Sequence, residues 1–203
     1  MGFGLIKAAA GGVLFLAASA VSASAGAPAP APLAIEHPIY LSVWLETPVD
    51  RPAAQVWARV GKYCDLAEWL RASCTITSGK DGELGAVRSL GIGGGGNTID
   101  EILVGKTDMS YTYTQPVRVG QPYILYHGTL EVKPVTATTS KIIYSLVWDG
   151  STLADDAARE RNKTQRSTTF KNASLNMKAL AEGRPMPPAA PPAGPAPAAP
   201  PAR

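Results

Sequence analysis

Arg88 and Glu101 are the two residues of this sequence whose types and spacing best fit chemistry. They lie in segments typical of β-strands, residues 86–92 and 98–105, which a glycine-rich turn separates. On adjoining antiparallel strands both side chains can reach one cavity, where the arginine holds an anionic or polarised oxygen and the carboxylate moves a proton. We therefore predict a catalytic pair, with a structural salt bridge in the cavity wall as the alternative.

Aromatic side chains recur in the strand-like segments that follow. Alternation along a strand puts Tyr111 on the same face as Tyr113, and Tyr144 on the same face as Trp148. An aromatic lining with a few hydroxyl groups is typical of a small-ligand site, and core packing is the alternative for most of these residues. The predicted ligand-binding residues are Trp69, Tyr111, Tyr113, Tyr126, Tyr144 and Trp148.

Several other chemistries find no support in the sequence. The only histidines are His37 and His127, and neither stands at a metal-ligand spacing from a cysteine, so we predict no metal site and no cofactor. The glycines at 93–96 lack the Lys-Ser/Thr and the helix start of a phosphate loop. The formal net charge is +3 and no basic cluster is interleaved with aromatics, which argues against nucleic-acid binding.

The first 25 residues have the three parts of a secretory signal peptide. Lys7 supplies the positive start, residues 8–21 form an apolar run, and Ala23-Ser24-Ala25 offers small residues at a cleavage site. The run is shorter than the roughly 20 residues that span a bilayer. We predict a periplasmic or secreted protein without stable membrane insertion after cleavage.

Export bears on the two cysteines, Cys64 and Cys74. Disulfides persist outside the cytosol, so the pair is a candidate bridge, with two buried thiols as the alternative. A bridge requires Cα atoms within roughly 7 Å, which the sequence does not show.

Two flanks are dominated by proline and alanine, residues 26–37 and 183–203. Proline at this density blocks helix and sheet, so we expect extended segments with little to bury. The tail is interpreted as a spacer or as a docking segment for a protein or cell-wall partner, with a disordered end that has no partner as the alternative. The domain between the flanks, residues 38–182, has a common single-domain size.

The strands and helices of this domain position the candidate site residues. Residues 39–47 alternate as a strand that Pro48 ends, and short helices are expected near 53–60 and 65–70. Turn signals then separate six strands, and a helix without Gly or Pro runs from about 153 to 181. Only its second half has a regular apolar face, so the polar stretch 159–166 is interpreted as solvated. The six strands are expected at residues 74–79, 86–92, 98–105, 109–115, 123–133 and 140–149.

This order predicts an α+β fold. Consecutive strands with short connections favour an antiparallel sheet of about seven strands. A curved sheet cannot leave one face bare, and the long C-terminal helix is its natural cover, with the two short helices after strand one at one end. A sheet that wraps around a helix in this way encloses a cavity.

The order and several local motifs resemble the helix-grip superfamily of START-related and polyketide-cyclase-like proteins, often called SRPBCC. The resemblance covers residues 38–182 and implies a helix-grip fold with a ligand cavity under the C-terminal helix. It is carried by VDRPAAQVW (49–57), LAEWL (66–70), GELGAVR (82–88), DEIL (100–103), the strand of Tyr111 and Tyr113, and YHGTL (126–130).

Residues 63–88 look most similar to the branch that contains lachrymatory-factor-synthase-like proteins. In that synthase a cavity Arg and Glu act on a small sulfenic acid, and the resemblance puts Arg88 and Glu101 in those places. Asp100 replaces the aromatic residue beside the Glu, so the resemblance implies an Arg–carboxylate pair in the pocket rather than the same reaction. The matching residues are Cys64, Trp69, Leu70, Cys74, Gly85, Arg88 and Glu101.

Three functions remain open at this point. The first is an exported protein that binds a small hydrophobic or amphipathic ligand in the cavity. The second is a cyclase-, dehydratase- or isomerase-like enzyme that uses the Arg–Glu pair. The third is an interaction protein that acts through its proline-rich tail. The fold cannot choose among them, because related folds host carriers and enzymes alike.

Overall fold

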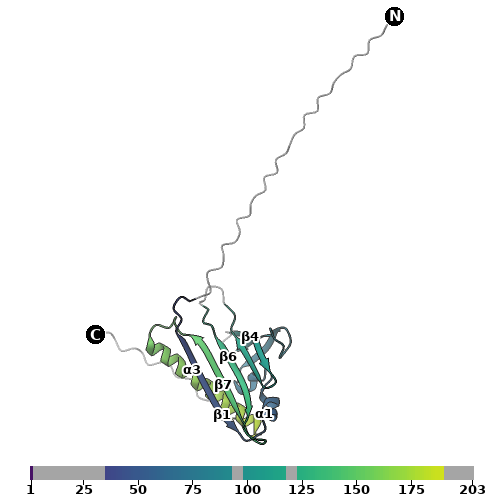
Figure 1. Cartoon of the computed structure of the whole chain (residues 1–203), viewed down its shortest axis with the longest axis vertical. Coiled ribbons are helices and arrows are strands. Elements are labelled where there is room, and N and C mark those ends of the chain that lie inside the picture. Colours follow the sequence, from purple (N-terminus) through teal and green to yellow (C-terminus); the bar gives the residue numbers. More distant parts are fainter. Residues whose placement is uncertain (2–34, 93–97, 118–122, 190–203) are drawn as a thin grey trace, which may run out of the picture. The chain divides into compact units, whose positions relative to one another are not determined.

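The structure, a computed structural model, describes Met1 and residues 35–92, 98–117 and 123–189 (Figure 1). The predicted signal peptide, the glycine turn at 93–96, residues 26–34 and residues 190–203 of the tail therefore lie outside the described residues. The predictions made for those segments stay predictions.

Seven strands form one sheet in the order β1-β7-β6-β5-β4-β3-β2, and every neighbouring pair is antiparallel. The sheet is a meander from β2 to β7, with β1 added at the edge beside β7. The predicted α+β helix-grip class is thereby confirmed. The strands are β1 (Tyr40–Val49), β2 (Ser73–Ser78), β3 (Val87–Gly91), β4 (Thr98–Thr107), β5 (Ser110–Thr114), β6 (His127–Pro134) and β7 (Ser140–Asp149).

Strand β1 runs two residues further than predicted. We expected Pro48 to end it, but Pro48 lies opposite Lys141 and pairing continues to Val49. Proline is tolerated on an edge strand, because the outward backbone groups of such a strand need no partner.

Among the described residues, three helices accompany the sheet: α1 (Ala53–Val60), α2 (Leu66–Trp69) and α3 (Asp156–Ala181). Helix α3 begins three residues later than expected, where the Asp155 side chain accepts a hydrogen bond from the Ala158 N–H at 2.6 Å. This is the usual N-cap arrangement, in which an acidic side chain satisfies a free N–H of the first turn.

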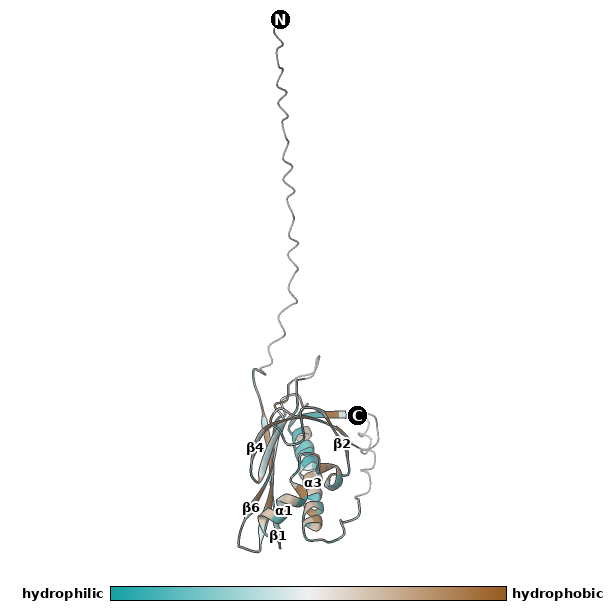
Figure 2. Ribbon diagram, turned by 90° about the vertical axis from the view of Figure 1, so that its right-hand side faces the viewer, coloured by the Kyte–Doolittle hydropathy of each residue, from teal (hydrophilic) through white to brown (hydrophobic). Residues whose placement is uncertain are grey.

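Helix α3 lies within the curve of the sheet (Figure 2). Its buried residues all belong to its second half, as the apolar spacing predicted, and Phe170, Ala173 and Met177 join the core. Inward residues of β5, β6 and β7, such as Tyr113, Leu130 and Tyr144, complete that core.

Cys64 and Cys74 are joined in a disulfide, with their Cα atoms 5.8 Å apart. The bridge ties the loop between α1 and α2 to the first strand of the meander. Among residues 35–92, 98–117 and 123–189, no helix is long and apolar enough to cross a membrane.

Candidate functional site

Arg88 and Glu101 face each other across neighbouring strands. Their Cα positions are register partners on β3 and β4, and both side chains point to the buried face. Arg88 Nε and Nη2 donate to the same oxygen, Glu101 Oε2, at 2.9 and 2.7 Å. Arg88 is 1% exposed and Glu101 4% exposed. The pair predicted from strand spacing is thus brought together and removed from bulk solvent.

Aromatic rings and a backbone carbonyl hold the Arg88 guanidinium. Its Nη1 donates to the carbonyl oxygen of Tyr63, and its Cζ lies 3.9 Å from the Tyr63 ring centroid and 4.8 Å from that of Tyr113. Cation–π contacts gain strength when they are desolvated, as here. Arg88 is therefore fixed on several sides rather than free to swing toward a ligand.

Burial and pairing act in opposite directions on the Glu101 carboxyl. Burial raises the pKa of Glu101 above its ordinary value, while the nearby Arg88 cation and hydrogen bonds from Arg88 and Gln115 lower it in part. Burial disfavours the Arg88 cation as well, but the surrounding tyrosine oxygens and Glu101 outweigh this and raise the pKa of Arg88. The result is a permanent cation beside a carboxyl group that is protonated more readily than one in water.

The pair lies in the wall of a cavity of about 360 Å³ between the sheet and α3. This volume is within the range of sites for small molecules. The wall combines apolar, aromatic and polar side chains from α2, β3, β4, β5, the segment before β6, β7 and α3. They are Leu66, Leu70, Arg88, Leu90, Ile92, Ile99, Glu101, Tyr113, Gln115, Tyr126, Tyr144, Asn162, Gln165, Arg166, Thr169 and Phe170.

Three of the predicted ligand residues, Tyr113, Tyr126 and Tyr144, belong to this wall. The hydroxyl groups of Tyr113 and Tyr144 are 2.7 Å apart and share a hydrogen bond. Burial raises the pKa of Tyr126 to about 12, so this hydroxyl stays neutral at physiological pH. A Cβ added at Gly128, the register partner of Tyr113, would collide with the tyrosine ring. Glycine at this position therefore allows Tyr113 to lie across β6.

The other three predicted ligand residues lie elsewhere. Tyr111 is buried and faces a separate pocket of about 450 Å³ beside α1 and the β4–β5 hairpin. Trp148 is buried under Arg166, whose Cζ is 4.9 Å from the indole ring. Trp69 is a core residue whose Nε1 donates to the Val60 carbonyl at 3.3 Å.

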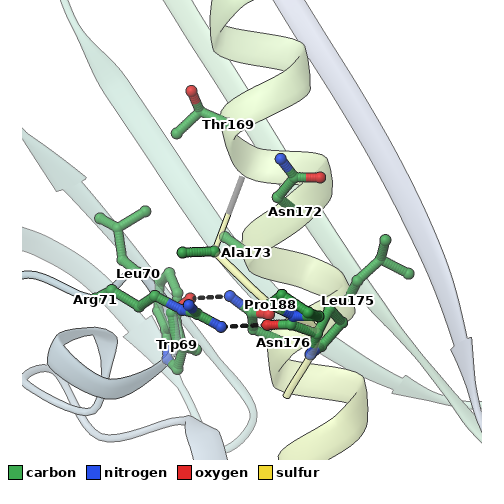
Figure 3. A pocket seen from close by; sticks show the side chains of 11 residues that line it. Trp69, Leu70, Arg71, Thr169, Asn172, Ala173, Leu175, Asn176 and Pro188 are labelled. Carbon is green, nitrogen blue, oxygen red and sulfur yellow. Dashed lines mark hydrogen bonds between the residues drawn. The ribbon is translucent and has the colours of Figure 1, made fainter. Parts of the chain in front are cut away.

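Trp69 also borders a pocket of about 280 Å³ that is lined by residues 69–71, residues of α3 and residues 187–189 (Figure 3). There its carbonyl oxygen accepts a hydrogen bond from Asn176 Nδ2 at 2.9 Å. Arg71 donates to the carbonyl of Pro187, so the first residues of the proline-rich tail form part of this pocket. The predicted aromatic set is thus divided among four environments.

Sequence reasoning missed the polar wall that α3 contributes. Asn162 and Arg166 were interpreted as a solvated face, yet both line the cavity. They precede Phe170 by eight and four residues, so they continue the apolar face of the helix toward its N-terminus. Extending that face backwards along the sequence would have found them.

The described residues offer no ready metal centre. Across 35–92, 98–117 and 123–189, no group of three or more His, Cys, Asp or Glu side chains is placed to hold an ion.

Residues 41–182 match the model of the family described as polyketide cyclase / dehydrase and lipid transport. This range is nearly the same as the domain delimited from the sequence. Among curated proteins, none matches this sequence closely enough to count as a relative.

Solved structures share the fold. A solution structure of a protein from Thermobifida fusca has a TM-score of 0.58 at 20% identity, covering 70% of this chain and 93% of that chain. A protein from Nitrosospira multiformis has a TM-score of 0.50 at 26% identity, covering 68% and 96%. Truncated norcoclaurine synthase from Thalictrum flavum has a TM-score of 0.51 at 15% identity, covering 70% and 94%. Such neighbours support the architecture rather than any one activity.

Proposed function

Because this chain belongs to the polyketide cyclase / dehydrase and lipid transport family, we propose that it binds a small hydrophobic or amphipathic ligand. We also propose that it is exported. The observation that carries the proposal is the cavity of about 360 Å³ between the sheet and α3. Its volume is in the range of small-molecule sites, and its wall combines the covering helix with the inward face of the sheet.

The composition of the wall supports an amphipathic ligand. Leu66, Leu90, Ile99 and Phe170 offer apolar surface, and Tyr144 stacks on Phe170 with ring centroids 4.5 Å apart. Polar side chains from the sheet and from α3 stand beside this apolar surface, among them Arg88, Glu101 and Arg166. Apolar walls supply affinity through burial, and fixed polar groups supply orientation.

A dye-binding assay on the mature protein tests the proposal. Nile red, a neutral apolar dye, is expected to bind with a rise in fluorescence. Ile99→Trp, which fills the cavity from β4, should weaken that binding by at least tenfold. Val104→Trp, on the exposed side of the same strand, is the matched control and should leave it unchanged. Equal dye binding by all three proteins would contradict the proposal.

Export is the second element of the proposal. It is supported by the three-part leader in residues 1–25 and is compatible with the Cys64–Cys74 disulfide. The full-length gene product should lose its leader near Ala25, and the mass of the protein recovered outside the cytoplasm reports this directly. An intact leader on the recovered protein would contradict export.

An enzymatic role is the second candidate, and the Arg88–Glu101 geometry favours it. The two hydrogen bonds from Arg88 to Glu101 both go to Oε2, so Oε1 receives none from Arg88, and burial raises the pKa of this carboxyl. A carboxyl group of this kind suits proton transfer. If Glu101→Gln keeps ligand affinity but abolishes conversion of a bound ligand, the enzyme is supported; if affinity alone falls, the carrier is supported.

An interaction role for the proline-rich tail remains a third proposal. Its described part, residues 183–189, contacts the domain through Arg71 and Pro187. A truncation after Gly183 that abolishes the cellular phenotype while ligand binding survives would support this role. Loss of both together would contradict it.

A further inference from the structure

Arg166 is a second arginine in the cavity wall, and it differs from Arg88 in having no carboxylate partner among the described residues. It is half-buried and extends from α3 into the lining. Its Nε donates to Asn162 Oδ1 at 3.1 Å, one turn earlier on the helix. The ion pairs of the described residues do not include Arg166.

The formal charges of the described lining residues do not cancel. Within the described lining, the ionisable groups of formal charge are Arg88, Glu101 and Arg166. Arg88 and Glu101 neutralise each other at 2.7 Å. One positive charge is left, and it belongs to a side chain with partial access to solvent, where a ligand can reach it.

Arg166 is held in place without being neutralised. Its Cζ lies 4.9 Å from the ring centroids of both Tyr126 and Trp148, so two aromatic rings contact the guanidinium. A guanidinium has five N–H donors, and the hydrogen bond to Asn162 uses one of them. A pre-oriented fork with unused donors matches the geometry of a carboxylate.

We propose that Arg166 is the anion-recognition residue of this cavity and that the ligand is an organic acid, an apolar body bearing a carboxylate. This inference rests on the proposed ligand-binding function and names its ligand class. The apolar body lies among the aromatic and aliphatic residues of the sheet, and the carboxylate accepts hydrogen bonds from Arg166. Arg88 cannot take this role, because Glu101 already occupies its Nε and Nη2 donors.

Displacement of bound Nile red by decanoate and by decan-1-ol tests the proposal, because the two competitors share the alkyl chain and differ in charge. The wild-type protein should bind decanoate at least tenfold more tightly than decan-1-ol at low salt. Arg166→Gln should reduce that preference to less than twofold while leaving decan-1-ol affinity unchanged, and Arg166→Lys should retain part of it.

Arg161→Gln is the matched control, since it removes the same charge from an exposed position of α3 outside the lining. Arg161→Gln should leave the preference for decanoate over decan-1-ol intact. If this variant loses as much of the preference as Arg166→Gln does, then overall charge rather than Arg166 sets the preference, and the proposal is overturned. Equal affinity of the wild-type protein for decanoate and decan-1-ol would also overturn it, while ligand binding itself would stand. If neither competitor nor the dye binds, the proposed function fails and the assignment of Arg166 fails with it.

Discussion

Arg88 and Arg166 line one cavity, the first from the sheet and the second from α3, and their surroundings differ sharply. Arg88 is almost wholly buried, paired to Glu101 by two hydrogen bonds and stacked on Tyr63. Arg166 is half-buried, touches two aromatic rings and has an amide rather than a carboxylate beside it. One arginine of this wall is therefore neutralised by a carboxylate, and the other has no carboxylate partner among the described residues.

The difference separates two uses of a buried cation. A charge that is fully desolvated needs a partner of opposite sign within the fold, since an unpaired charge in the interior is very costly. A charge with partial access to water can be left uncompensated until a ligand arrives. We therefore expect Arg88 to matter most for the folded state and Arg166 most for binding.

The largest expected effect is that of Arg88→Met on stability. It leaves the Glu101 carboxyl buried without its cation, and the loss of one member of a buried pair costs about 3–5 kcal/mol. Urea unfolding of the mature protein measures the free energy of unfolding. The double variant Arg88→Met, Glu101→Leu should recover most of the loss, because it removes the unpaired group; a double variant as unstable as the single one would contradict this account.

The Cys64–Cys74 disulfide stabilises the segment that contacts Arg88. Cys64 follows Tyr63, whose carbonyl accepts a hydrogen bond from Arg88, so the bridge to Cys74 anchors that segment. Its sequence separation is 10 residues, and closing a loop of that length contributes about 2.5–3 kcal/mol. Replacing both cysteines with serine should lower the free energy of unfolding by that amount in urea titrations.

The decanoate preference assigned to Arg166 should survive this double serine variant if the variant is assayed well below its unfolding transition. If the decanoate preference disappears when the free energy of unfolding falls, the surroundings of Arg88 and of Arg166 are not independent.

The pH dependence of stability distinguishes burial from pairing at Glu101. A raised folded-state pKa means that the unfolded chain releases its proton first, so the contribution of Glu101 to stability falls as pH rises above its ordinary value of 4.5. The free energy of unfolding of the wild type, measured relative to that of Glu101→Gln, should therefore decrease as pH rises above 4.5.

Glu68→Gln is the control of opposite sign. Hydrogen bonds from Arg59 lower the pKa of the Glu68 carboxyl, so its contribution is present at neutral pH and is lost as pH falls through the acid range. If the Glu101 difference instead grows with pH, as for Glu68, then pairing with Arg88 outweighs burial.

The smallest effect on stability is expected for Arg166→Gln. Cation–π contacts at partly exposed sites contribute about 0.5–1 kcal/mol each at most, and glutamine keeps the packing of the alkyl stem in part. With two such contacts, the free energy of unfolding should fall by no more than about 2 kcal/mol. A loss comparable to that of Arg88→Met would remove the distinction between the two arginines.

The sequence predicted most of the fold, because strands and helices leave local signals. Turn residues bounded most strands of the meander, and the spacing of Phe170, Ala173 and Met177 identified the face of α3 that packs. The strand expected at 123–133 begins only at His127, because Leu125 has a φ of 45°, which a strand does not adopt. The end of β1 was misplaced, since Pro48 is a strand breaker except at a sheet edge, and the position of β1 at the edge is a property of the whole sheet.

The candidate site was predictable only in part. Alternation sufficed to put Arg88 and Glu101 on inward faces, but the aromatic residues that share an inward face divide among different pockets. Tyr111 and Tyr113 are neighbours on one face of β5, yet they line different pockets. Which pocket a residue lines depends on the helices that cover each part of the sheet, and no strand period contains that information.

By itself, the sequence determined the order of elements, the inward faces of the strands and the residue types able to form an ion pair. Only the tertiary structure decided that Glu101 compensates Arg88 and leaves Arg166 without a carboxylate among the described residues. The reason is physical: periodicity is a local property of the chain, whereas charge compensation depends on which side chains from distant segments come within about 3 Å of each other.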